Sequence, residues 1–131
     1  MKGADIILGW ISDIGQIHLY DTKAHGNSAP EVDESQDVKL LHGYQNETHT
    51  VLAFERPWDT CDPNDLVLNS DTTRLIWSYH DQDPIDINSL IYHGSQRRGV
   101  RSVYLQELPQ AKLKNDDLKV WNLTSQVKLV S

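Results

Sequence analysis

The sequence is poor in sulfur and has no long apolar run. It contains one cysteine, Cys61, and one methionine, Met1, among 131 residues. A single cysteine cannot form a disulfide within the chain. The longest apolar stretches, such as 4–11 and 50–54, are well below the roughly 18 to 20 residues that span a bilayer. The sequence therefore predicts neither an internal disulfide nor a membrane span.

Positive charge is also scarce. Twelve Lys and Arg residues accompany 19 Asp and Glu residues, which gives a net charge of −7 and a pI near 5.2. An acidic surface repels phosphate groups, which argues against nucleic acid or an anionic membrane as a partner. The sequence lacks the basic, apolar and small-residue regions of a signal peptide, and as written this would leave the chain in the cytoplasm. Its length and its 38% hydrophobic content suit one domain with a modest core.

The chain does contain a series of strand patterns. Apolar residues that alternate or form short runs, with β-branched and aromatic side chains, recur between turn-forming residues. They predict six strands, at 4–11, 15–21, 37–44, 49–56, 73–80 and 100–108. Tight turns are expected at 12–15 and 45–48, and long surface loops at 23–35 and 81–99. We therefore predict an all-β fold, an antiparallel β-sandwich.

Four blocks of the sequence carry a family resemblance. They read "GADIILGW", "SQDVKLLHG", "RPWDTCDPNDLVLNSDTTRLIWSYHDQDP" and "YHGSQRRGVRSVYL". Their order and spacing closely resemble the DOMON domain of the dopamine β-monooxygenase and DBH-like copper monooxygenases. The resemblance implies a partial DOMON domain at 1–107, with immunoglobulin-like architecture and without its first strands. It also implies that 108–131 is a linker or docking tail toward an absent copper-binding domain.

The resemblance also implies where the family's chemistry lies. In these monooxygenases, ascorbate-dependent hydroxylation of a small substrate such as a phenylethylamine uses two coppers, held in later domains by histidine clusters and a methionine. This chain has six isolated histidines and only Met1, so it cannot build those copper sites. We expect a non-catalytic interaction or regulatory module, inactive on its own. Its expected partners are the copper-binding domains of a full-length chain or sister subunit, or a second copy in a homodimer.

A hard-cation site is the alternative function that the resemblance implies. The Asp5 and Asp37 carboxylates, with the main-chain oxygens of Ile6 and Thr22, would bind an ion of the Ca²⁺ type. Asp21 is the replacement ligand if the register differs by one residue. Ca²⁺ takes several carboxylate and carbonyl oxygens, so a metal-binding or small-ligand-binding module is consistent with this set. The competing interpretation is that both aspartates are solvated carboxylates at strand ends.

Cys61 and two histidines have further interpretations. The resemblance implies that Cys61 forms half of an interdomain disulfide, whereas a lone cysteine is otherwise a small buried hydrophobe. His42 and His49 flank the turn at 45–48, so in a regular hairpin they would lie nearly opposite each other and could offer two imidazoles to a metal. Distant DOMON relatives bind haem through Met and His. Exposure of both histidines at the surface is the alternative.

Two short motifs concern glycosylation. The sequons "NET" at Asn46 and "NLT" at Asn122 predict N-glycosylation if the chain enters the secretory pathway. The family resemblance implies that pathway, with an extracellular or vesicular destination.

Overall fold

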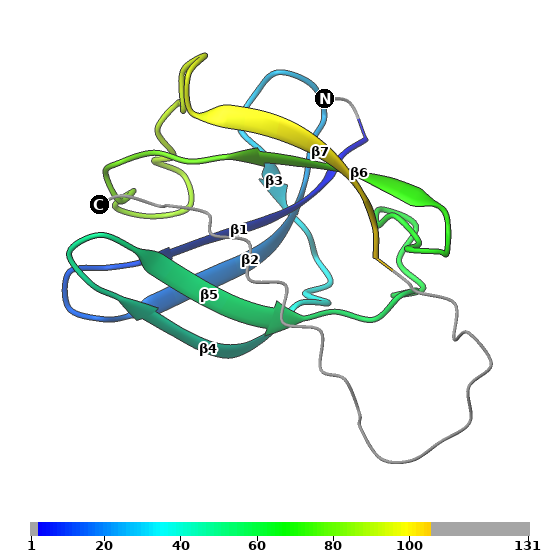
Figure 1. The fold of residues 1–131 in the computed structure, drawn as a ribbon, viewed down its shortest axis with the longest axis horizontal. Helices are drawn as coiled ribbons and strands as arrows, with labels where there is room; N and C mark the ends of the chain where they lie inside the picture. Colours follow the sequence, from blue (N-terminus) through cyan, green and yellow to red (C-terminus); the bar gives the residue numbers. More distant parts are fainter. Residues whose placement is uncertain (1–2, 106–131) are drawn as a thin grey trace.

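The computed structural model describes residues 3–105, which form seven β-strands and no helix (Figure 1). The strands are β1 (Asp5–Ile11), β2 (Ile17–Lys23), β3 (Glu31–Val32), β4 (Lys39–Gln45), β5 (Thr50–Glu55), β6 (Thr72–Ser78) and β7 (Arg98–Tyr104). The predicted all-β class is confirmed, and each predicted strand overlaps an observed one. No helix able to span a bilayer occurs in this part of the chain. The predicted tail, 108–131, lies outside the described residues.

The strands pair antiparallel into three small sheets. β2 lies between β1 and β3, while β4–β5 and β6–β7 are two-stranded hairpins. The predicted turn at 12–15 joins β1 to β2, where the Gly15 amide donates to the Ser12 carbonyl at 2.8 Å. Gly15 has a φ of 80° there, a conformation that glycine adopts without steric cost. The other predicted turn, 45–48, lies at the tip of the β4–β5 hairpin, so both turns are confirmed.

Close approach between β1 and the β4–β5 hairpin depends on two glycines. β1 contacts both β4 and β5. A Cβ atom at Gly9 would lie 2.6 Å from Leu52 Cδ1, and one at Gly43 would lie 2.9 Å from Leu52 Cδ2. The side chain of Leu52 therefore occupies space that these two glycines leave open.

The buried apolar residues are few and lie at the two ends of the β1–β2 pair. Trp10, Ile11 and Ala24 are the buried apolar residues of the described chain. The Trp10 ring stacks on His18, with ring centroids 4.4 Å apart and an angle of 8° between the planes, and a second contact joins Trp10 to Tyr20 at 5.6 Å. Many large apolar side chains on the other strands are exposed instead, so residues 3–105 cover only part of their own apolar surface.

Candidate cation site

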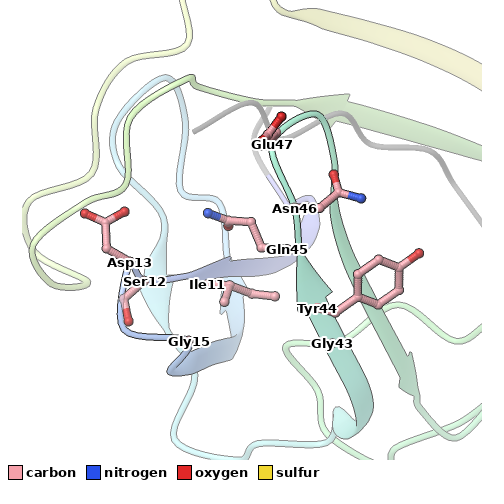
Figure 2. A pocket seen from close by; sticks show the side chains of 9 residues that line it. All are labelled: Ile11, Ser12, Asp13, Gly15, Gly43, Tyr44, Gln45, Asn46 and Glu47. Atoms are coloured by element: carbon pink, nitrogen blue, oxygen red, sulfur yellow. The ribbon is translucent and has the colours of Figure 1, made fainter.

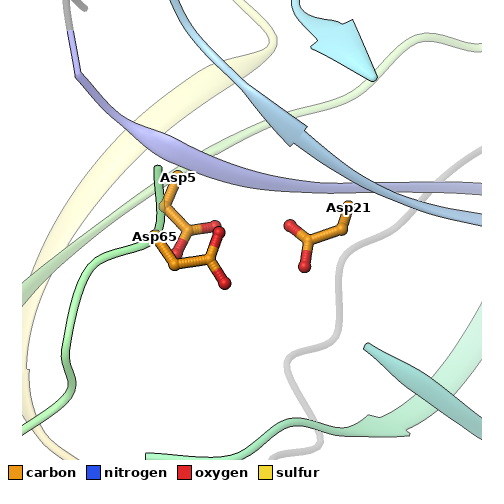
Figure 3. A group of neighbouring side chains, drawn as sticks. All are labelled: Asp5, Asp21 and Asp65. Atoms are coloured by element: carbon orange, nitrogen blue, oxygen red, sulfur yellow. The ribbon is translucent and has the colours of Figure 1, made fainter. Parts of the chain in front are cut away.

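Three aspartates come together at the open end of the β1–β2 pair. Ile7 lies opposite Asp21 in the register, and residues two apart on a strand share a face. Asp5 and Asp21 are therefore diagonal neighbours on one face. Asp65, from the segment between β5 and β6, joins them, and one carboxylate oxygen of each residue lies within 4.8 Å of the others (Figure 3).

The segment 33–37 wraps around the backbone of Asp21. The Gln36 side-chain amide accepts a hydrogen bond from the Asp21 amide and donates to the carbonyls of Asp21 and Asp33, each at 2.9 Å. The Asp37 amide donates to Asp21 Oδ2 at 3.2 Å. These bonds hold the Asp21 carboxylate in place and bring Asp37 beside it.

Arg56 supplies the local counter-charge. Its Nη1 donates to Asp5 Oδ2 at 2.7 Å, and its Nη2 lies 3.4 Å from Asp65 Oδ2 and 3.1 Å from the Leu66 carbonyl. The side chains of Arg56, Asp5 and Asp65 are only 10%, 6% and 3% exposed. One guanidinium thus links two carboxylates where water screens them little.

The electrostatics favour an additional positive charge. Burial, followed by the charge of Asp65, raises the pKa of Asp21 to about 6, although the hydrogen bond from the Asp37 amide opposes this shift. Burial also raises the pKa of Asp65. Asp21 is 1% exposed, and its Oδ1 atom has no hydrogen-bond partner. A buried carboxylate oxygen without a donor is costly, and a cation bound beside it would remove that cost.

Of the four predicted ligands, Asp5 belongs to this cluster and Asp37 lies beside Asp21. The Ile6 carbonyl accepts a hydrogen bond from Thr22 Oγ1 at 2.7 Å, and Ile6 and Thr22 are paired across β1 and β2. Asp37 Oδ2 is buried without a hydrogen-bond partner. Hard oxygen donors of these kinds suit Ca²⁺. The ligand set of Asp5, Ile6, Thr22 and Asp37 stays a prediction.

Sequence reasoning missed two members of the cluster. Asp65 and Arg56 belong to the block that carries the family resemblance, but neither was assigned to the site. Asp21 was considered only as a replacement ligand. The sequence signal was the density of aspartates at 59–65 directly after an arginine.

The two histidines expected to face each other across the β4–β5 hairpin do not do so. Ala53, and not His49, lies opposite His42, because the turn pairs Gln45 with Thr50 and the register continues without a shift from there to His42. The expected juxtaposition of the two histidines is therefore wrong. Within residues 3–105, the cluster of three or more potential ligand side chains is the aspartate group, which lacks histidine.

Cys61 lies on the surface of the segment between β5 and β6. Its thiol is exposed, and its amide donates to Asp59 Oδ1 at 2.8 Å. Exposure contradicts the interpretation of Cys61 as a buried hydrophobe. The interdomain disulfide stays a prediction.

Comparison with known proteins identifies the domain. The family model described as DOMON domain matches residues 1–80. The chain is 47% identical to MOXD1 homolog 2 of Drosophila melanogaster over 102 residues, which are 76% of this chain and 12% of that protein.

Two vertebrate proteins are similar over more of this chain. It is 37% identical to DBH-like monooxygenase protein 1 of Gallus gallus over 125 residues, which are 95% of this chain and 20% of that protein. It is 28% identical to the dopamine beta-hydroxylase of Rattus norvegicus over 105 residues, 80% of this chain and 17% of that protein. The chain thus spans a fifth or less of these three relatives. With this fold and these matches, the chain belongs to the DOMON domain family.

Proposed function

We propose that this chain is a non-catalytic interaction module of a DBH-like monooxygenase that packs against the copper-binding domains of a longer polypeptide. The relatives named as monooxygenases extend far beyond the region that matches this chain. In these relatives the family implies copper and ascorbate, whereas the described histidines here form no cluster. The proposal therefore assigns catalysis elsewhere, and it assigns the protein to the secretory pathway by its relatives.

The observation that carries this proposal is an exposed apolar face on the β6–β7 hairpin. Ile76 and Val100 lie opposite each other, as do Thr72 and Tyr104. Ile76, Val100 and Tyr104 are 41%, 60% and 72% exposed. We call this surface the Ile76 face. Adjacent apolar side chains exposed on a two-stranded sheet are typical of a surface that another protein element covers.

Charge supports the same face. Arg74 and Arg98 lie on the same side of the β6–β7 hairpin as Ile76 and Val100. Within residues 3–105, neither arginine forms an ion pair with a carboxylate. β6 and β7 contain no acidic residue. Exposed arginine and tyrosine beside aliphatic side chains are enriched in protein interfaces, so the partner surface is expected to carry carboxylates.

A binding measurement tests this function. The chain would be immobilised and exposed to the separately produced copper-binding half of the longer polypeptide, with surface plasmon resonance as the readout. Val100→Glu places a charge in the Ile76 face and is expected to weaken binding about tenfold or more. The matched control is Ile85→Glu, which adds the same charge at a residue 93% exposed in a loop. Absence of binding by the unchanged chain, or equal losses for both variants, would contradict the proposal.

A second candidate function is cation binding at the aspartate cluster. The observation that favours it is the buried, unpartnered Oδ1 of Asp21 beside two further carboxylates. An ion bound only to the folded state raises the melting temperature. Millimolar Ca²⁺ is therefore expected to raise the melting temperature of the chelator-treated chain.

Variants at the cluster make this test specific. Asp5→Asn and Asp21→Asn are each expected to reduce the Ca²⁺-dependent shift, while Glu47→Gln, on an exposed hairpin tip, should leave it unchanged. Comparison of Asp37→Asn with Asp65→Asn separates the two possible ligand sets. If Ca²⁺ does not change the melting temperature of the unchanged chain, a cation site at the aspartate cluster would be excluded.

A further inference from the structure

The tip of the β4–β5 hairpin is held by an asparagine side chain. Asn46 Oδ1 accepts three hydrogen bonds, from the Thr48 amide at 2.9 Å, Thr48 Oγ1 at 3.1 Å and the His49 amide at 2.8 Å. Asn46 is exposed. Its Nδ2 atom donates no hydrogen bond to any described residue. The oxygen is thus fixed by the turn, and the nitrogen is left at the surface.

The same hairpin presents an aromatic ring on the side to which the Asn46 side chain projects (Figure 2). Tyr44 is the second-last residue of β4, and Asn46 follows the end of that strand; the two side chains project to the same side (Figure 2). Figure 2 shows this arrangement, with Gln45 directed the other way toward Ile11. Tyr44 is 54% exposed. An exposed ring offers a flat apolar face, against which the C–H groups of a sugar ring can pack.

We propose that Asn46 is an N-glycan acceptor and that the first sugar of the glycan packs against the ring of Tyr44. The Asn46 Nδ2 bonds to the C1 atom of the first sugar of a lipid-pyrophosphate-linked oligosaccharide. The bond from C1 to the pyrophosphate oxygen breaks, the lipid pyrophosphate leaves, and Nδ2 loses one proton. The hydroxyl of Thr48, which the sequon requires, already contacts the side-chain amide of Asn46.

This assignment rests on the proposed secretory location and not on the docking function. In this assignment the tip of the β4–β5 hairpin carries a glycan, whereas the β6–β7 hairpin binds a partner. The glycan would cover Tyr44 at the tip of the β4–β5 hairpin (Figure 2). The Ile76 face lies on a different hairpin and stays available for a partner.

Mass spectrometry tests whether Asn46 carries a glycan. The chain would be directed into the secretory pathway of cultured cells by a heterologous leader, and its glycans would be located by intact mass and by digestion with an amidase that converts a glycosylated Asn to Asp. Asn46→Asp keeps the Oδ1 acceptor of the turn but removes the nucleophilic amide, so it should lack one glycan. Thr48→Ser should keep that glycan, and Asn122→Gln controls for the second sequon. A lumenal chain with unmodified Asn46 would overturn the proposal, whatever the outcome of the docking test.

The packing on Tyr44 has a separate readout. The glycan at Asn46 is expected to raise the melting temperature by about 4 °C relative to the enzymatically deglycosylated chain. In Tyr44→Ala this difference should fall by half or more, whereas Tyr104→Ala, at another exposed tyrosine, should preserve it. An equal difference in the unchanged chain and in Tyr44→Ala would show that the sugar does not use this ring.

Discussion

At the scale of single residues, Asp21 has a carboxylate that is shielded from water. The carboxylate of Asp21 is buried beside those of Asp5 and Asp65 (Figure 3), and burial raises its pKa from 3.8 to about 6. The folded chain therefore binds a proton at Asp21 more tightly than the unfolded chain does. The stability that this proton contributes is fully present below pH 3.8 and is lost as the pH rises through about 6.

The first prediction concerns this loss in the absence of metal. With chelator present, the free energy of unfolding is expected to decrease by about 1 kcal/mol between pH 5 and pH 7 through Asp21. The pKa of Asp65 is raised in the same direction. Urea unfolding at the two pH values measures the effect, and Asp21→Asn should make the profile flatter. A profile in Asp21→Asn as steep as that of the unchanged chain would assign the effect to other groups.

The sequence predicted some of the residues at the aspartate cluster but not others, and the reason is geometric. Asp5 and Asp37 were identified through the family resemblance, and Asp21 follows from the strand register. Arg56 and Asp65 reach the cluster only because the segment after β5 folds back over β1, and they lie 51 and 60 residues from Asp5. Local patterning contains no information on such a contact.

At the scale of elements, hairpins were predictable and inter-sheet contacts were not. Alternation and turn residues located the strands, because both depend on neighbouring positions. β3, with two residues, is too short to show a pattern. The close approach at Gly9 was invisible for another reason, since glycine in an apolar strand has several structural explanations.

The second prediction tests that close approach. Gly9→Ala places a Cβ 2.6 Å from Leu52 Cδ1 and 3.0 Å from the backbone carbonyl of His18. The backbone atom cannot move aside without disturbing the β1–β2 pairing, so a loss of about 1 to 3 kcal/mol is expected. Chemical denaturation measures this loss.

The matched control is Gly26→Ala. A Cβ there meets no atom within 4 Å, and the residue has no positive φ. Its stability should be unchanged or slightly increased. Similar losses of stability for Gly9→Ala and Gly26→Ala would mean that a Cβ atom at Gly9 does not clash with Leu52.

At the scale of the whole molecule, a net charge of −7 accompanies exposed apolar surface. Like-charge repulsion keeps copies apart at low ionic strength. Salt shortens the range of this repulsion, from about 10 Å at 0.1 M to about 3 Å at 1 M. Salt does not weaken the attraction between apolar surfaces such as the Ile76 face in this way.

The third prediction is that self-association increases with salt. Sedimentation velocity of the chain should show a larger average mass near 1 M than near 0.1 M sodium chloride. Val100→Glu should reduce the increase, and Ile85→Glu should not. An average mass that is constant across this range would indicate that the exposed apolar residues do not attract one another.

The bonds of Asp5 also have a consequence for synthesis on the ribosome. Asp5 Oδ2 accepts from Arg56, 51 residues later, and from the Leu66 amide, 61 residues later. β1 therefore leaves the ribosome long before Arg56, whose guanidinium neutralises the carboxylate of Asp5. Until Arg56 has emerged, pairing of β1 with β2 brings Asp5 and Asp21 together without this counter-charge, which disfavours early docking of that end. The order of translation thus delays fixing of the aspartate end of the β1–β2 pair until the segment after β5 is available.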